Sequence, residues 1–126
     1  MPTLAAGFLT LILALFQGAA MASNLVTDIE RIRQTDKSDQ IDISTTVQSH
    51  IAAGTGRKDV ERRLQQQGFT LHEQPEAADK TRTLIAVRKE KGLIASLGFH
   101  DEIRVVIIFD NDKVKHASGL LIYRAL

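Results

Sequence analysis

The hydrophobic period of this chain changes once, at Gly68, and the change limits the folds open to it. Before Gly68, apolar residues recur every three or four positions, as in helices with one buried face, over residues 24–35, 44–52 and 57–67. After Gly68 they alternate with polar residues or run together, as in strands, over residues 69–73, 83–90, 102–109 and 113–123. Helices followed by consecutive strands predict an α+β fold, a two-layer sandwich with N-terminal helices packed on a three- to four-stranded antiparallel sheet.

The helical segments carry start and stop signals. Polar residues 36–40 follow the first segment and are expected to form a solvated linker. Ser44 is expected to cap the second helix. Gly68 is a suitable residue to end the third helix, because glycine adopts positive φ without steric cost. The positions expected to face the core are Leu25, Ile29, Ile32, Val60 and Leu64.

Turn residues separate the strands. Residues 74–80 contain Pro75 and three charged side chains and are expected to be a loop. Residues 91–100 show no clean period and are expected to be a long hairpin connection with apolar contacts of its own. Asp110–Lys113 is expected to be a tight turn, because Asn and Asp tolerate positive φ. Gly119 is expected to mark a bulge or bend in the last strand.

The N-terminus is a distinct segment, with no charged side chain before Asp28. An apolar run over residues 4–16 precedes Ala20-Met21-Ala22, a small-residue cleavage pattern, and together they predict a signal peptide. The alternatives are a retained membrane anchor over residues 4–26 and an apolar helix buried in the fold. Signal or anchor implies an exported protein, periplasmic or membrane-associated. The expected organisation is a signal or anchor at 1–22, a short helix and linker at 23–40, and an α+β domain at 41–126.

The composition excludes several classes of function. Lys and Arg number 16 against 15 Asp and Glu, so the net charge is +1, and no nucleic-acid partner is expected. The absence of Cys excludes disulfides, a thiolate nucleophile, Cys-ligated zinc and a lipid-modified cysteine. The oligomeric state is left open.

Three short patterns could carry chemistry, and each has a structural explanation. Residues 54–58, Gly-Thr-Gly-Arg-Lys, lack the spacing of a phosphate-binding loop and are expected to form a corner between helices. Residues 110–112 begin like a calcium loop but lack its Gly and distal Glu. The four histidines have no metal-ligand spacing, although a site assembled in three dimensions stays open. No catalytic, cofactor-binding or metal-ligating residue is predicted, and no cofactor is expected.

The strongest strand, residues 102–109, is apolar on both faces. A sheet with one face in water should alternate more cleanly. The face that carries Arg104, Val106 and Ile108 is therefore the candidate partner-binding face. The alternatives are that residues 91–100 or the N-terminal helix cover it.

Two stretches resemble BamE-like (SmpA/OmlA) domains. The stretch from His50 to Val60 (HIAAGTGRKDV) resembles their helix corner, with Gly56 where the family usually has a capping Thr. The stretch from Val105 to Val114 is similar to their strand–turn–strand ending. The resemblance covers about two-thirds of the chain and implies two helices followed by a three-stranded antiparallel sheet, an architecture shared with β-lactamase-inhibitor-protein repeats. It also implies an envelope setting, and a sheet face with adjacent loops that binds another protein without catalysis.

Three hypotheses of function follow. The first is an exported, non-enzymatic interaction domain of the bacterial cell envelope that binds a protein partner. The second is a small hydrolase, or a metal- or ligand-binding protein, with a site built from dispersed His and carboxylates; His72, His100 and Asp101 would have to converge in one cleft. The third is a membrane-tethered inhibitor or immunity-type protein that keeps the segment 4–26.

Overall fold

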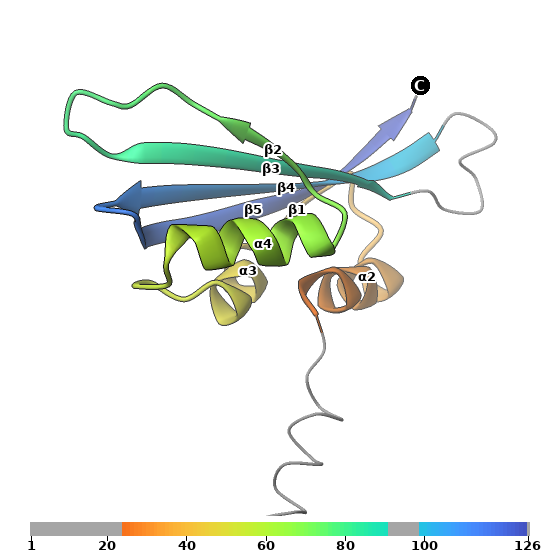
Figure 1. Ribbon diagram of the computed structural model, residues 1–126. Coiled ribbons are helices and arrows are strands. Elements are labelled where there is room, and N and C mark those ends of the chain that lie inside the picture. Colours follow the sequence, from red (N-terminus) through yellow and green to blue (C-terminus); the bar gives the residue numbers. More distant parts are fainter. Residues whose placement is uncertain (1–23, 91–98, 126) are drawn as a thin grey trace, which may run out of the picture.

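The computed structural model describes residues 24–90 and 99–125 and shows an α+β fold, as predicted (Figure 1). The expected signal or anchor at 1–22 and residues 91–98 of the expected connection lie outside the described residues. The helices and strands within the described residues are α2 (Leu25–Thr35), β1 (Gln40–Asp42), α3 (Ser44–His50), α4 (Arg57–Gln66), β2 (Thr70–Glu73), β3 (Arg82–Glu90), β4 (Phe99–Asp110) and β5 (Lys113–Ala125).

The strands form one antiparallel sheet of five, in the order β1-β5-β4-β3-β2. The prediction of three to four strands is wrong because it lacks β1. That strand has three residues in a polar segment, too few to show an alternating pattern, and it is defined by its pairing with β5, where Ile41 lies opposite Leu121. Its first residue, Gln40, was expected in the linker. β4 also begins earlier than expected, at Phe99 rather than Glu102.

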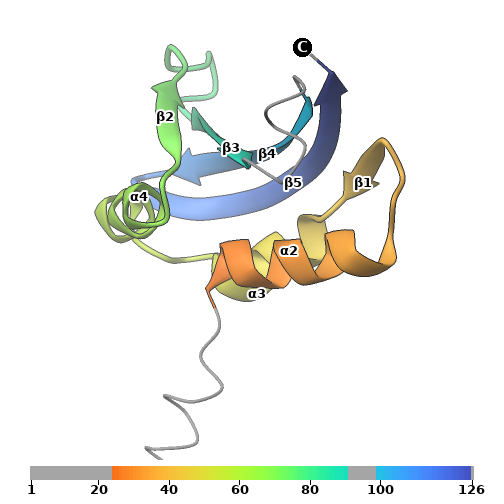
Figure 2. The same cartoon turned by 90° about the vertical axis from the view of Figure 1, so that its right-hand side faces the viewer.

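The three described helices lie on one face of the sheet, and the strands curve away from α2 and α3 (Figures 1 and 2). Along β4, Ile103, Val105 and Ile107 are fully buried beneath the helices, whereas Val106 and Ile108 point the other way and are only half-buried. The opposite face, which is concave in Figure 2, is called the outer face. From β3, β4 and β5 it carries Thr83, Ile85, Val87, Lys89, His100, Glu102, Arg104, Val106, Ile108, His116, Ser118, Leu120, Ile122 and Arg124, and the edge strands add Asp42 from β1 and His72 from β2.

Helix α2 starts with a capped turn and belongs to the core. The Asn24 side chain accepts a hydrogen bond from the backbone N–H of Thr27 at 2.8 Å, which satisfies one of the free amides of the first turn. Leu25 and Val26 are buried, and the backbone N–H of Val26 donates to the Gln67 side chain at 3.2 Å. The last residues of the expected anchor at 4–26 are thus part of the fold. Helix α2 therefore does not cover the outer face.

The corner between β1 and α3 differs from the prediction. Ser44 is the first residue of α3, and Ile43 stands at the cap position without a side-chain hydrogen bond. Asp42 accepts from the backbone N–H of Ser44 at 2.9 Å, and the Ser44 hydroxyl accepts from the backbone N–H of Gly119 at 3.1 Å. Hydrogen bonding to the side chain and backbone of Ser44 holds the pKa of Asp42 below its usual value. Ser44 therefore joins the corner to β5 instead of capping the helix.

Gly119 marks a close approach of a helix and not a bulge. The register shift between β4 and β5 lies at Ile108 and Phe109. At Gly119, α3 lies so close to β5 that an added Cβ would be 2.8 Å from Val47 Cγ2 and 3.1 Å from Ile43 Cγ1. A side chain there would collide with the helix, which is one of the usual reasons for glycine inside a strand.

Other local predictions are confirmed. Val60 and Leu64 of α4 are buried, each 1% exposed. Gly68 follows α4 with a φ of +87°. Asn111 and Asp112, in the turn between β4 and β5, have φ values of +53° and +59°. Positive φ at both central residues is the conformation that a two-residue hairpin turn favours.

Candidate interaction surface

Arg104, Val106 and Ile108 lie together on the outer face and are all half-buried. Antiparallel pairing sets their cross-strand neighbours, which are Val87 and Leu120 for Arg104, Ile85 and Ser118 for Val106, and Thr83 and His116 for Ile108. Within residues 24–90 and 99–125, no helix lies over these side chains (Figure 2).

The outer face carries an apolar patch that extends beyond the predicted residues. Its members come from β3, β4 and β5, and all of them are half-buried: Ile85, Val87, Val106, Ile108, Leu120 and Ile122. A contiguous apolar patch of this kind typically marks an interaction site. Sequence reasoning found only the members on β4, because the others depend on the register between strands, which no local pattern specifies.

One end of the outer face is ionic. Glu102 is buried, with 8% of its side chain exposed, and its carboxylate lies 2.8 Å from Arg104 Nη2 and 3.5 Å from Arg124 Nε. Lys89 is exposed on the neighbouring strand, directly opposite Glu102. Two arginines therefore contact this carboxylate and Lys89 lies opposite it, whereas Asp42 of β1 brings a second carboxylate near Arg104, so this end has an excess of one positive charge. Sequence reasoning missed Glu102, Arg124 and Lys89 as members of the surface.

A shallow hollow of about 200 Å³ lies between the ionic end and the corner of β1 and α3. Ligand pockets for drug-sized molecules typically measure ~300–1,000 Å³, so this hollow is small for a cofactor. It is lined by Asp42, Ser44, Arg104, Val106, Ser118, Gly119 and Leu120.

The Gly-Thr-Gly-Arg-Lys corner at residues 54–58 anchors α4 to the turn between β4 and β5. The backbone N–H of Gly54 donates to the carbonyl of Val114 at 2.8 Å, and that of Arg57 donates to the carbonyl of Asp112 at 2.9 Å. These amides already have protein acceptors, so they are not available to a phosphate. The corner has a structural role in the described residues, as the sequence favours.

The Arg57 side chain strengthens the same corner. Its Nε donates to Glu61 at 2.9 Å, its Nη2 pairs with Glu73 on β2, and its Nη1 lies 3.6 Å from Asp112. The hydrogen bond to Glu61, with the nearby acidic charges, raises the pKa of the Arg57 guanidinium. Helix α4 is therefore tied to β2 and to the β4–β5 turn by one side chain.

The histidines lie apart. His72 and His116 are exposed on the outer face, and His100 is half-buried on the same face but at the other end of the sheet, opposite Arg124. Asp101 points to the helix-bearing face, where its Oδ1 lies 3.1 Å from Nη2 of Arg33 at the end of α2. The structure does not bring His72, His100 and Asp101 into one cleft.

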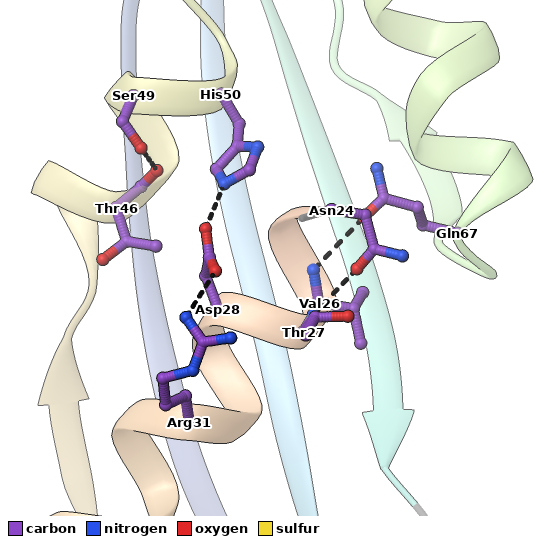
Figure 3. Close-up of polar contacts among 9 residues, drawn as sticks. All are labelled: Asn24, Val26, Thr27, Asp28, Arg31, Thr46, Ser49, His50 and Gln67. Carbon is purple, nitrogen blue, oxygen red and sulfur yellow. Dashed lines mark hydrogen bonds and ion pairs between the residues drawn. The ribbon is translucent and has the colours of Figure 1, made fainter. Parts of the chain in front are cut away.

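His50 forms a polar cluster that the sequence analysis missed (Figure 3). Its Nε2 lies 2.6 Å from Oδ2 of Asp28, and Oδ1 of the same carboxylate accepts from Arg31 at 3.3 Å. The pair joins α3 to α2 across 22 positions of sequence. The nearby Ser49 hydroxyl donates to the carbonyl of Thr46. The cluster links two helices, and its hydroxyl faces the backbone of its own helix rather than the imidazole (Figure 3).

The described residues hold neither a metal-binding cluster nor a membrane-spanning helix. Residues 24–90 and 99–125 contain no group of three or more His, Asp and Glu side chains placed to hold a metal ion. The helices of this part of the chain are also too short or too polar to cross a bilayer.

Comparison of the chain with family models, with curated proteins and with solved structures found no match in any of the three. The similarity to BamE-like domains therefore stays a prediction.

Proposed function

We propose that this chain is an exported, non-enzymatic protein-interaction domain of the bacterial cell envelope, and that it binds its partner through the outer face. The apolar patch across β3, β4 and β5 carries this proposal. Its side chains are half-buried without a described helix above them, while Ile103, Val105 and Ile107 of β4, which face the helices, are fully buried. Soluble domains seldom leave a contiguous apolar patch unless something binds there.

The start of the fold supports export. The expected cleavage site after Ala22 lies just before Asn24, whose side chain caps α2. Cleavage there leaves the cap, the burial of Leu25 and the bond from Val26 to Gln67 intact. The resemblance of the Gly54–Lys58 corner and of the β4–β5 hairpin to BamE-like domains supports an envelope setting.

The first test is the intact mass of the native protein in separated soluble and membrane fractions. A soluble species that starts at Ser23 is the expected result. An uncleaved species in the membrane fraction would favour the tethered inhibitor or immunity-type protein instead. An uncleaved species in the soluble fraction would refute both export and tethering.

The second test replaces Val106 or Ile108 by Lys and measures co-purification of envelope proteins with the full chain. A charge in the apolar patch should abolish partner binding while the circular dichroism spectrum and melting temperature change little, because both side chains are only half-buried. Thr45→Lys, at an exposed position of α3, is the matched control and should retain binding. Loss of folding in Val106→Lys and Ile108→Lys would show that the face is covered within the chain.

A further inference from the structure

This inference rests on the proposed function, because it gives the chemistry of the partner for the same surface. We propose that the outer face binds an amphipathic helix of a partner protein, whose apolar stripe covers Ile85, Val106 and Leu120 and whose acidic side chain pairs with Arg104.

The sheet itself favours a helix over an extended segment. The backbone of β4 is paired with β3 and β5, and the part of β3 that carries Ile85 and Val87 is paired with β2 and β4, so the strands beneath the centre of the patch are already hydrogen-bonded to their neighbours. An extended peptide lying flat on this face would leave its own N–H and C=O groups without partners, which is costly in a dry interface. A helix satisfies its backbone internally and presents only side chains.

The shape of the face also fits a helix. Figure 2 shows the strands curving so that the outer face is concave. Ile85, Val106 and Leu120 lie on the consecutive strands β3, β4 and β5. Adjacent strands are ~4.8 Å apart, so three strands present a floor ~10 Å wide. An α-helix with its side chains is ~10–12 Å in diameter and so matches this floor.

The charged side chains beside the apolar patch favour a helix that carries an acidic residue. Arg104 stands between two apolar neighbours, Val87 and Leu120, and its side chain is 39% exposed. Only its Nη2 has a hydrogen-bond partner among the described residues, namely Glu102, so its remaining N–H groups can bind a second carboxylate. Lys89 and Arg124 add positive charge on the same side, and with Arg104 they outnumber the carboxylates there, Glu102 and Asp42, by one.

A small anionic ligand fits this surface less well. The hollow beside Arg104 measures about 200 Å³ and is open to solvent, and the Asp42 carboxylate lines it. A free fatty acid or phosphate would find little enclosure there. The apolar patch and the arginine together extend over three strands, an area suited to a protein segment.

The test uses the full chain in its native cells, with a photoreactive phenylalanine derivative in place of Val106. The crosslinked partner peptide is identified by mass spectrometry. The expected product is a partner segment with apolar residues at helical spacing and an Asp or Glu beside them. The same probe at Thr45, on α3, should give no such product.

A charge exchange tests the pairing with Arg104. Replacing the partner's acidic residue by Lys should lower the yield of crosslink at least about tenfold, and Arg104→Glu should restore it. Because Arg104→Glu places a second carboxylate beside the buried Glu102 and risks unfolding, Lys89→Gln and Arg124→Gln provide a second series. Each should lower the yield about two- to fivefold at low salt and less at high salt. Lys58→Gln, at an exposed position on α4, is the control for net charge and should have no effect.

The outcomes separate this inference from the proposed function. Crosslinks to an envelope protein through an extended or non-acidic segment would refute the helix while the proposed function stands. Crosslinks only to residues 91–98 of the same chain, to lipid or to a second copy would refute the inference and, because no partner protein is then bound at this face, the proposed function as well. The absence of any crosslinked partner protein would refute the inference and the proposed function together.

Discussion

The close approach of α3 to β5 makes Gly119 a position where a single added methyl group would collide with the core. In Gly119→Ala the new Cβ would lie 2.8 Å from Val47 Cγ2, 3.1 Å from Ile43 Cγ1 and 3.3 Å from the backbone oxygen of Arg104. Extra volume in a packed core lowers the free energy of unfolding by about 1–3 kcal/mol. Replacing glycine by alanine in a strand by itself raises the free energy of unfolding by about 0.5–1 kcal/mol, because alanine has less conformational entropy in the unfolded chain. We expect a net loss of about 1–2 kcal/mol in the free energy of unfolding.

The assay is urea unfolding followed by far-ultraviolet circular dichroism, since the chain has no Trp. For a domain of this size the loss corresponds to a melting temperature lower by roughly 5–15 °C. The steric cause of this loss is tested in a Val47→Ala background, which lacks the Cγ2 methyl group that lies nearest to the added Cβ. There we expect Gly119→Ala to cost at least about 1 kcal/mol less than in the wild-type background.

Gly54→Ala is the matched control. Its φ is +90° and no atom lies within 4 Å of an added Cβ, so it should cost about 1 kcal/mol through backbone strain alone. That cost should be the same in the wild-type and in the Val47→Ala background, because the strain does not involve α3. If Gly119→Ala stabilised the protein, or cost as much in the Val47→Ala background as in the wild type, the steric account of this position would be wrong.

Three further changes have expected outcomes. Gly56→Ser should raise the free energy of unfolding by about 1 kcal/mol in urea titrations, because the N-cap of α4 lacks a side-chain acceptor and has a φ of −67° that serine adopts. Leu25→Ala should lower it by about 2–5 kcal/mol, because this side chain is 1% exposed. The pKa of the Asp42 carboxyl group is lower in the folded protein than its usual value of 3.8. The ionised carboxylate therefore stabilises the fold at pH values above 3.8, and this stabilisation should be lost as the pH falls below 3.8. Between pH 5 and pH 3, the free energy of unfolding of Asp42→Asn should therefore fall less than that of the wild-type protein.

Features encoded by neighbouring residues could be predicted. Gly68 ends α4 with positive φ, and Asn111 with Asp112 turns β4 into β5, because each residue tolerates the backbone conformation that its position requires. The two faces of β4 could also be separated, since side chains alternate along a strand. The candidate residues Arg104, Val106 and Ile108 share a face for that reason alone.

Features that depend on distant residues could not be predicted. β1 exists because residues 40–42 pair with β5 about 80 positions later, and the segment itself is polar. Ser44 has the chemistry of a helix cap, yet its hydroxyl accepts from Gly119 instead. Asp28 and His50 meet because two helices cross the same face of the sheet. In each case the local sequence is compatible with several structures or partners, and contacts with distant residues decide which of them forms.

The ion pair on the outer face is difficult to explain by folding alone. Glu102 is buried beside Arg104, and removing a carboxylate from water costs free energy that the ion pair often fails to recover. The strands already supply apolar neighbours on this face, Val87 and Leu120 beside Arg104 and Ile122 opposite Glu102, so an apolar pair could occupy both positions with equal or greater stability. An arginine held by a buried carboxylate is also an oriented arginine, because one of its nitrogens is fixed while the others have no hydrogen-bond partner among residues 24–90 and 99–125. An oriented arginine among apolar side chains can bind a carboxylate that is itself flanked by apolar residues. The proposed partner helix would present such a carboxylate.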